Sequence, residues 1–374
     1  MANLKPLDIA KDLKYIHVMC KCLGLSPYTI NKNNFPEEVT IDYTFKNNIM
    51  ITIWATIFAF LLFIGDILLV MPNQKYMLSL SVTENVNELV CLPLYSAVAS
   101  LAIVINLTIN KCKMYEFVTK ISRIDNKLNR LNKTKYSLIH QKLIPDPEIL
   151  IFMFIFLPYL VYDTSVWITG DSIAKCLDYR FGNIIDIALI LHFCSCIKII
   201  RKRLSKLCKC TEDMIMPILV IPQLRNVLGE ICEAARILNS MYGLLVLLEF
   251  VKIFLTVIGN ITSLITLLYN CDFEKAISFI IWKLIGMAEL LYIVITCHMT
   301  VTKLNTLNNI IHNTVLSRYP LSTDMFQQIK LFLHQISTCG LEFTACHLFK
   351  LDFQFLCGVL ASFVTYGVIL VQFK

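Results

Sequence analysis

Seven long apolar stretches constrain the fold of this 374-residue chain more than any other feature of its sequence. A helix needs about 20 mostly apolar residues to cross the hydrocarbon layer of a bilayer. The stretches of this length are Ile49–Val70, Leu89–Ile109, Ile149–Thr169, Phe181–Ile200, Gly243–Tyr269, Ala276–Cys297 and Phe353–Phe373. Only 16% of the residues are charged, against about 25% in soluble domains. The sequence therefore predicts an all-α polytopic membrane protein with seven transmembrane helices.

Lysine and arginine are distributed unequally between the two sides of the membrane. With Lys198 counted at the inner end of the fourth stretch, 27 of the 34 lie in the N-terminal segment and in the loops after the second, fourth and sixth stretches. Five lie on the other side. Basic residues near span ends are retained in the cytoplasm, so we expect a cytoplasmic N-terminus and an extracellular C-terminus. The net charge of +7 then reflects topology, and we expect no nucleic-acid partner.

This orientation is the reverse of that of a G-protein-coupled receptor. Neither D-R-Y after the third stretch nor N-P-x-x-Y in the seventh is present. The motifs G-x-S-x-G, H-E-x-x-H and G-x-x-x-x-G-K-[ST] are also absent. We therefore expect neither an enzyme nor a bound cofactor.

The segments outside the stretches divide the chain into regions. Residues 1–48 form a cytoplasmic N-terminal segment, 49–300 a six-helix sensing bundle, 301–352 cytoplasmic anchor helices and 353–374 the seventh span. Two cytoplasmic linkers within the bundle, 110–148 and 201–242, are expected to be helical. The outer loops, 71–88, 170–180 and 270–275, are too short to form a binding domain. An external small molecule must therefore bind in a cavity among the helices.

The inner linkers carry apolar residues at helical spacing, with basic residues on the other faces. These apolar residues are Met114, Phe117, Ile121, Ile124, Leu128 and Leu131, and then Phe326, Ile329, Leu333 and Ile336. Two interpretations stay open. The linkers are helices that lie on the membrane or on their neighbours, or several spans continue into the cytosol and pack together as an anchor between subunits.

Fifteen cysteines are scattered through the spans and the cytoplasmic segments, which is not the arrangement of a disulfide framework. The histidines show no metal-ligand spacing relative to them, so we expect structural cysteines and no metal site. Cys176 and Cys271 are the only two cysteines in the outer loops. The sequence allows a disulfide between them.

Charged residues inside the apolar stretches each require an explanation, because a charge at mid-bilayer costs about 3 kcal/mol even on an insertion scale. Asp163, Asp186 and Lys283 fall in the outer half, and Glu249, Lys252 and Glu289 lie nearer the cytoplasm. One interpretation is that they are paired within the bundle. Glu249 would pair with Lys252 one turn away, and Lys283 with an aspartate across the bundle.

A second interpretation is that the outer charges line a wet ligand cavity with nearby aromatic residues. Ligand pockets combine large apolar faces with a few polar groups that fix orientation. The candidate residues are Tyr95, Tyr159, Tyr162, Asp163, Asp186, Trp282 and Lys283. Asp163 with Tyr159 and Tyr162 is the cluster to test first. Trp167 is better explained as a residue of the membrane-interface belt.

The end of the chain carries a specific pattern. Thr365-Tyr366, five apolar residues and Gln372-Phe373 resemble the TYhhhhhQF signature (h apolar) of insect gustatory receptors. Phe349, Leu351 and Asp352 precede the last span in the F-x-L-D order common in that family, and residues 23–27 (LGLSP) look like its N-terminal motif. The resemblance covers the whole chain in length, span count and orientation. Its sequence-specific part is mostly the last thirty residues.

The resemblance implies a fold and a mechanism. Insect gustatory receptors, like the related odorant receptors, form tetrameric ligand-gated cation channels in the plasma membrane of sensory dendrites. A tastant binds in the outer half of the second to sixth spans, and the seventh span lines the pore. Phe373 would be the hydrophobic gate, and Gln372 would face the ions on opening. Other receptor subunits (in a homo- or heterotetramer), cations and the lipid bilayer are the implied partners.

Helical spacing extends the implied pore lining. Thr365 and Val368 or Ile369 share a stripe with Gln372, whereas Tyr366 is expected to pack against neighbouring helices. Sugar receptors of this family tend to have Glu after the Thr-Tyr pair, and this chain has Gly367. Gly367 therefore argues against a sweet receptor, and the bitter, fructose-type and carbon dioxide branches of the family remain. A receptor for bitter or plant compounds is favoured because that branch is abundant in the family. A fructose-type receptor, an odorant receptor, a metabotropic receptor of inverted topology and a transporter remain as alternatives.

Overall fold

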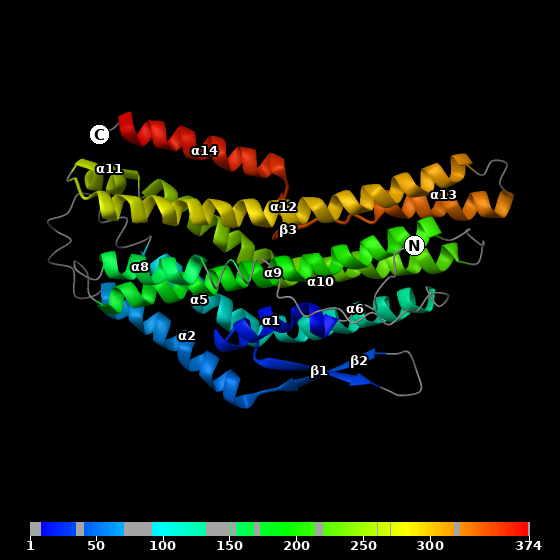
Figure 1. Ribbon diagram of the computed structural model, residues 1–374, viewed down its shortest axis with the longest axis horizontal. Helices are drawn as coiled ribbons and strands as arrows, with labels where there is room; N and C mark the ends of the chain where they lie inside the picture. The colour runs from blue at the N-terminus through cyan, green and yellow to red at the C-terminus, as the bar shows by residue number, and fades with distance from the viewer. Residues whose placement is uncertain are drawn as a thin grey trace.

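Long helices that run side by side dominate the computed structural model (Figure 1). The structure describes residues 9–34, 41–70, 92–131, 151, 155–167, 173–213, 220–259, 261–269, 271–317 and 322–372. Among these, four helical segments are long and apolar enough to cross a membrane: Pro93–Leu131, Arg180–Glu212, Ile221–Ile258 and Phe273–Asn313. Ile49–Gly65 and Phe353–Ile369 are shorter apolar helices.

Where the structure describes the predicted spans, each of them overlaps at least one helix. The helices are α2 (Ile49–Val70), α5 (Leu92–Ile105), α8 (Leu157–Trp167), α9 (Ile173–Asp213), α10 (Ile221–Gly259), α11 (Ile261–Tyr269), α12 (Phe273–Ser317) and α14 (Phe353–Gln372). The predicted fifth span is divided between α10 and α11, and Asn260 lies outside the described residues. The structure thus confirms the all-α class and shows longer helices than the spans alone.

The helices that cross the membrane continue into the basic segments. α9, α10 and α12 have 41, 39 and 45 residues, so each is about 60 Å long at 1.5 Å per residue. The hydrocarbon layer is only about 30 Å thick. No proline separates the apolar half of these helices from the charged half. The spans therefore continue as helices into the basic segments, as the second interpretation expects, and the anchor between subunits stays a prediction.

The first linker is also continuous with its span. A π turn, η3 (Asn106–Asn110), joins α5 to α6 (Lys111–Leu131). The apolar stripe expected on α6 is buried, including Met114, Phe117 and Ile121, and the helix packs against α10. α13 (Thr323–Thr338) buries Ile329 and Ile336 in the same way, whereas Phe326 is exposed. Helical periodicity predicted the α6 face correctly, and the α13 face at Ile329 and Ile336 but not at Phe326.

Two short hairpins were not predicted. β1 (Tyr28–Asn34) pairs antiparallel with β2 (Ile41–Asn47), and β3 (Thr344–Ala345) with β4 (Phe349–Lys350). The alternation Ile-Asp-Tyr-Thr-Phe at 41–45 is a strand signal. An N-terminal helix, α1 (Ile9–Cys22), precedes the first hairpin and buries Leu13, Ile16 and Cys20.

Gly24 ends α1 and explains part of the N-terminal motif. Its φ of +76° is the left-handed conformation that glycine adopts without strain. A Cβ at this position would lie 2.9 Å from Cβ of Ala55, so glycine also allows the chain to approach α2. The N–H of Leu25 donates to the carbonyl of Cys20 at 2.8 Å and closes the helix end.

A network of buried ion pairs connects α1, α6 and α9 at the basic end of the bundle. Arg203 is fully buried and binds Asp125 through two hydrogen bonds of 3.0 and 2.8 Å. A third bond of 2.7 Å joins Arg203 to Asp12. Burial raises the pKa of the Asp125 carboxyl, and the Arg203 guanidinium opposes that shift. The charge of Asp125 therefore depends on Arg203.

Candidate functional site

Two clusters of polar residues lie among the spans. The first, here called the outer cluster, comprises Tyr159 and Asp163 of α8, Arg180 of α9, and Ser278 and Trp282 of α12. Asp163 is fully buried, forms an ion pair with Arg180 and accepts a hydrogen bond from the Ser278 hydroxyl. The Tyr159 hydroxyl donates to the Ser278 carbonyl at 2.9 Å.

Aromatic rings close one side of the outer cluster. The Trp282 ring centroid lies 5.7 Å from that of Tyr159 and 5.8 Å from that of Phe156. The Arg180 guanidinium carbon lies 5.2 Å from the Trp282 centroid, in cation–π geometry. Flat rings beside a neutralised ion pair present apolar faces with fixed polar groups, which is the composition of a small-molecule site.

Arg180 and Ser278 are the residues of the outer cluster that the sequence prediction missed, and Arg180 is the charged one. It was counted in an outer loop, but α9 begins at Ile173 and carries Arg180 inside the bundle. Asp163 pairs with Arg180, and Asp186 pairs with Lys252. The expected pairing of Lys283 with an aspartate across the bundle stays a prediction. An aspartate in a span requires a cation at similar depth. That requirement is the signal that would have pointed to Arg180.

The second cluster, here called the central cluster, surrounds the buried ammonium of Lys252 on α10. Asp186 of α9 and Glu249 both form ion pairs with it, and the pairing of Glu249 with Lys252 confirms the sequence prediction. The Tyr95 ring centroid lies 4.9 Å from the Lys252 nitrogen. Glu289 of α12 adds a third carboxyl to the electrostatic surroundings of Lys252. The Lys252 ammonium is thus the positive charge that compensates several buried carboxyl groups.

Five of the seven predicted ligand residues belong to these clusters. Tyr159, Asp163 and Trp282 belong to the outer cluster, and Tyr95 and Asp186 to the central one. Tyr162 is 49% exposed, with its ring centroid 6.5 Å from that of Tyr159. The Lys283 ammonium lies 5.0 Å from the Phe279 ring centroid. The Trp167 side chain lies outside the described residues.

α9 connects the two clusters. Arg180 and Asp186 are six residues apart on it, which is about 9 Å along the axis. Gly182 lies between them, and a Cβ there would lie 3.2 Å from the Tyr95 carbonyl carbon. α9 can therefore approach the backbone of α5 closely, and both clusters share one rigid element.

The last helix, α14, has one packed face and one exposed face. Phe363 and Tyr366 contact the ring of Phe254 on α10, with centroid separations of 5.4 and 5.9 Å. Tyr366 therefore packs on a neighbouring helix, as expected, although its outer side is exposed. On the other face Thr365, Val368, Ile369 and Gln372 are exposed. Phe373 lies outside the described residues.

The F-x-L-D residues, Phe349, Leu351 and Asp352, stabilise the start of α14. Phe349 stacks on Phe355 with a centroid separation of 4.1 Å. Leu351 is buried, and its N–H donates to the Phe343 carbonyl at 2.9 Å. The Asp352 carboxylate accepts the N–H of Phe355 at 2.9 Å, which caps the helix. This part of the family pattern therefore has a structural role before the last span.

The outer cysteines are described only in part. Cys271 is an exposed free thiol, whereas the Cys176 side chain lies outside the described residues. The disulfide between them stays a prediction. No group of three or more metal-ligating side chains occurs among the described residues.

These features define a multi-pass helical membrane protein with buried charged clusters and a distinct final helix. A model described as "7tm Chemosensory receptor" matches residues 13–374, so the chain belongs to this receptor family, which is not a family of enzymes. No curated protein sequence matches the chain. The assignment to the receptor family therefore rests, at the level of sequence, on the match to the family model.

Solved structures agree on the fold. The insect olfactory receptor OR5 from Machilis hrabei superposes with a TM-score of 0.68, covering 98% of this chain and 99% of that one at 14% identity. The same receptor in complex with eugenol gives a TM-score of 0.67 at 13% identity, with the same coverage. At these identities the likeness concerns the fold.

Proposed function

We propose that the chain is a subunit of a ligand-gated, non-selective cation channel, a gustatory receptor opened by a small-molecule tastant. The observation that carries the proposal is the two-faced α14. One face packs on α10, and the opposite face leaves Thr365, Val368 and Gln372 exposed on one stripe. In a tetramer, four such stripes would face a shared pore. Residues 49–300 would then sense the ligand and 353–374 would conduct.

The end of α14 has the chemistry of a pore constriction. A ring of phenylalanines from position 373 would close a narrow pore by dewetting, and a ring of Gln372 amides offers dipoles that do not trap a cation. The charge bias assigns this end to the extracellular side. The outer stripe and the terminal residues therefore carry the proposed gate.

The outer cluster supports a neutral aromatic ligand. Its two opposite charges, Asp163 and Arg180, already neutralise each other. Tyr159 and Trp282 add the flat faces that an aromatic compound stacks on. One of the solved structures similar to this chain contains eugenol, a phenolic plant compound. A bitter or plant secondary compound is the proposed ligand class, and the TYhhhhhQF ending favours a taste receptor in the dendrites of gustatory neurons.

The odorant receptors are the nearest alternative, since the structural matches are to an olfactory receptor. A fructose-type receptor, a metabotropic receptor of inverted topology and a transporter are the others. Locating the transcript in taste or olfactory sensilla separates the first two classes. Recordings separate a channel from the last two.

We expect an activating compound from a panel of plant phenolics and alkaloids to evoke a cation current in cells that express the chain. The current should persist when the pipette contains a non-hydrolysable GDP analogue, because the proposed pore is part of the receptor. Whole-cell recording measures this, and mock-transfected cells are the control. Loss of the current under the GDP analogue would favour the metabotropic alternative, and substrate flux without unitary currents would favour the transporter.

A further inference from the structure

One face of α10 contacts the segment that leads to α14 at several successive positions. The stripe comprises Arg225, Gly229, Cys232, Arg236, Asn239 and Gly243, which recur every three or four residues on one helical face. We call it the α10 stripe. Its partners are α13 and residues 339–352, here called the linker.

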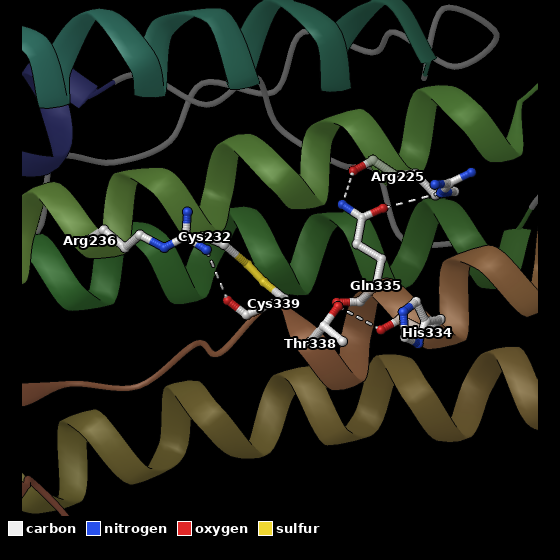
Figure 2. The surroundings of a disulfide bond; sticks show 7 residues. All are labelled: Arg225, Cys232, Arg236, His334, Gln335, Thr338 and Cys339. Atoms are coloured by element: carbon white, nitrogen blue, oxygen red, sulfur yellow. Dashed lines mark hydrogen bonds between the residues drawn. A yellow bond between two sulfur atoms is a disulfide. The ribbon is translucent and has the colours of Figure 1, made fainter.

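The contacts follow the stripe in order. Arg225 Nε donates to Gln335 Oε1 at 3.2 Å, and Gln335 Nε2 donates back to the Arg225 carbonyl at 2.9 Å (Figure 2). Further along, Asn239 Nδ2 donates to the Glu342 carbonyl at 2.7 Å. A Cβ at Gly243 would lie 3.0 Å from the Cys346 nitrogen, so glycine allows the linker to approach. The linker is thus fixed by polar contacts and close packing.

A disulfide between Cys232 and Cys339 lies in the middle of the stripe (Figure 2). Their Cα atoms are 6.3 Å apart, and both residues are buried. Cys339 follows the last residue of α13, where the linker begins. The sequence prediction of structural cysteines did not foresee this pair, which is separated by 107 residues. The bond joins the stripe covalently to the start of the linker.

The pair lies on the side that the charge bias assigns to the cytoplasm. Cys232 precedes Gly243, the start of the predicted fifth span, by eleven residues, or about 16 Å of helix. The cytosol keeps thiols reduced, and the disulfides that do form there are mostly transient or redox-sensing. We propose that Cys232 and Cys339 are a reversible redox pair, two thiols in the resting cytosol and a disulfide under peroxide, which fastens the linker ahead of α14.

The surroundings of the pair suit this chemistry. A groove of 540 Å³ is lined by Arg225, Gly229 and Gln335, and Cys232 lies one turn beyond Gly229. The groove comes within one helical turn of the pair, and neither cysteine lines it. Arg236 donates a hydrogen bond to the Cys339 carbonyl oxygen at 3.5 Å. A cation close to a thiol favours the thiolate, which is the reactive form.

The reaction balances with hydrogen peroxide as the oxidant. The thiolate of one cysteine attacks peroxide, the O–O bond breaks, and a sulfenic acid forms with release of one water after protonation. The thiol of the other cysteine then attacks that sulfur, the S–S bond forms, and a second water leaves. Two thiols lose two electrons in total, and peroxide gains them. A dithiol reductant reverses the step by exchange and becomes a disulfide itself.

Differential alkylation of the full-length chain in intact cells tests the pair. Free thiols are blocked with one maleimide, the chain is reduced, and newly exposed thiols receive a second label read by mass spectrometry. We expect the disulfide fraction of Cys232 and Cys339 to rise about fivefold with peroxide and to fall again with a permeant dithiol. Cys208, also buried in the cytoplasmic half, is the matched reference and should not change in parallel.

Hydrogen exchange on the purified chain supplies the conformational readout. Oxidation should slow amide exchange in the linker about tenfold, and Cys232→Ser should abolish that difference while Cys208→Ser keeps it. A pair that stays reduced under peroxide, or one that is fully bonded before treatment, overturns the proposal. If a membrane-impermeant reductant opens the bond in intact cells, the assigned orientation is wrong as well.

Discussion

Replacing Lys252 with methionine is expected to remove most of the folded receptor from the cell surface. The Lys252 side chain is 2% exposed, and its ammonium forms ion pairs with Asp186 and Glu249, whose side chains are also buried. Glu289 lies nearby. Removing one partner of a buried ion pair costs about 3–5 kcal/mol, which is a large share of a typical stability of about 5–15 kcal/mol. Surface biotinylation and the thermal midpoint in detergent measure the loss.

Neutralising the carboxyl partners of Lys252 should recover part of the lost surface expression and thermal stability. Lys252→Met combined with Asp186→Asn and Glu249→Gln removes the charges of the two carboxyl groups paired with Lys252, keeps similar side-chain volumes and leaves Glu289 unchanged. Lys209→Met, an exposed lysine on α9, is the matched control and should behave as wild type. Normal surface expression of the single variant, or no recovery in the triple variant, would show that the central cluster does not hold the bundle together.

Arg203→Ala is the second change with a large expected effect. It removes three hydrogen bonds to Asp125 and Asp12, and leaves the Asp125 carboxylate buried with no guanidinium beside it. We expect a loss of about 3–5 kcal/mol in the free energy of unfolding. Asp125→Asn in the same chain should recover about half, since an amide is cheaper to bury than a charge. Arg123→Ala, exposed on α6, is the matched control.

The Arg203 variant also has an expected pH dependence. Burial raises the pKa of Asp125, and the Arg203 guanidinium limits that rise in the wild type. In the variant the folded chain should hold the proton more tightly than the unfolded chain. Stability then falls as pH rises above the ordinary carboxyl pKa, so the thermal midpoint should be higher at mildly acidic pH than at neutral pH. A midpoint that rises with pH in the variant would contradict the assignment.

The parts of the fold that follow from local sequence were predictable. Hydrophobic length gave Ile49–Val70 with the same bounds as α2, and helical periodicity gave the buried face of α6. Pairings set by tertiary packing were not predictable in this way. Arg180 meets Asp163 only because α9 starts eight residues before its predicted span. The partner of Cys232 lies 107 residues away, and spacing alone does not identify it.

Single-channel recording of the purified chain in a planar bilayer tests whether α14 lines a cation pore. We expect unitary cation currents when an activating compound is added, in the absence of any other protein. Gln372→Glu should raise the unitary conductance at low salt, because a ring of four carboxylates concentrates cations at the pore. Gln327→Glu adds the same charge at an exposed position of α13 and should leave the conductance unchanged. Absence of compound-evoked unitary currents, or an unaltered conductance in Gln372→Glu, would contradict the assignment of α14 as the pore helix.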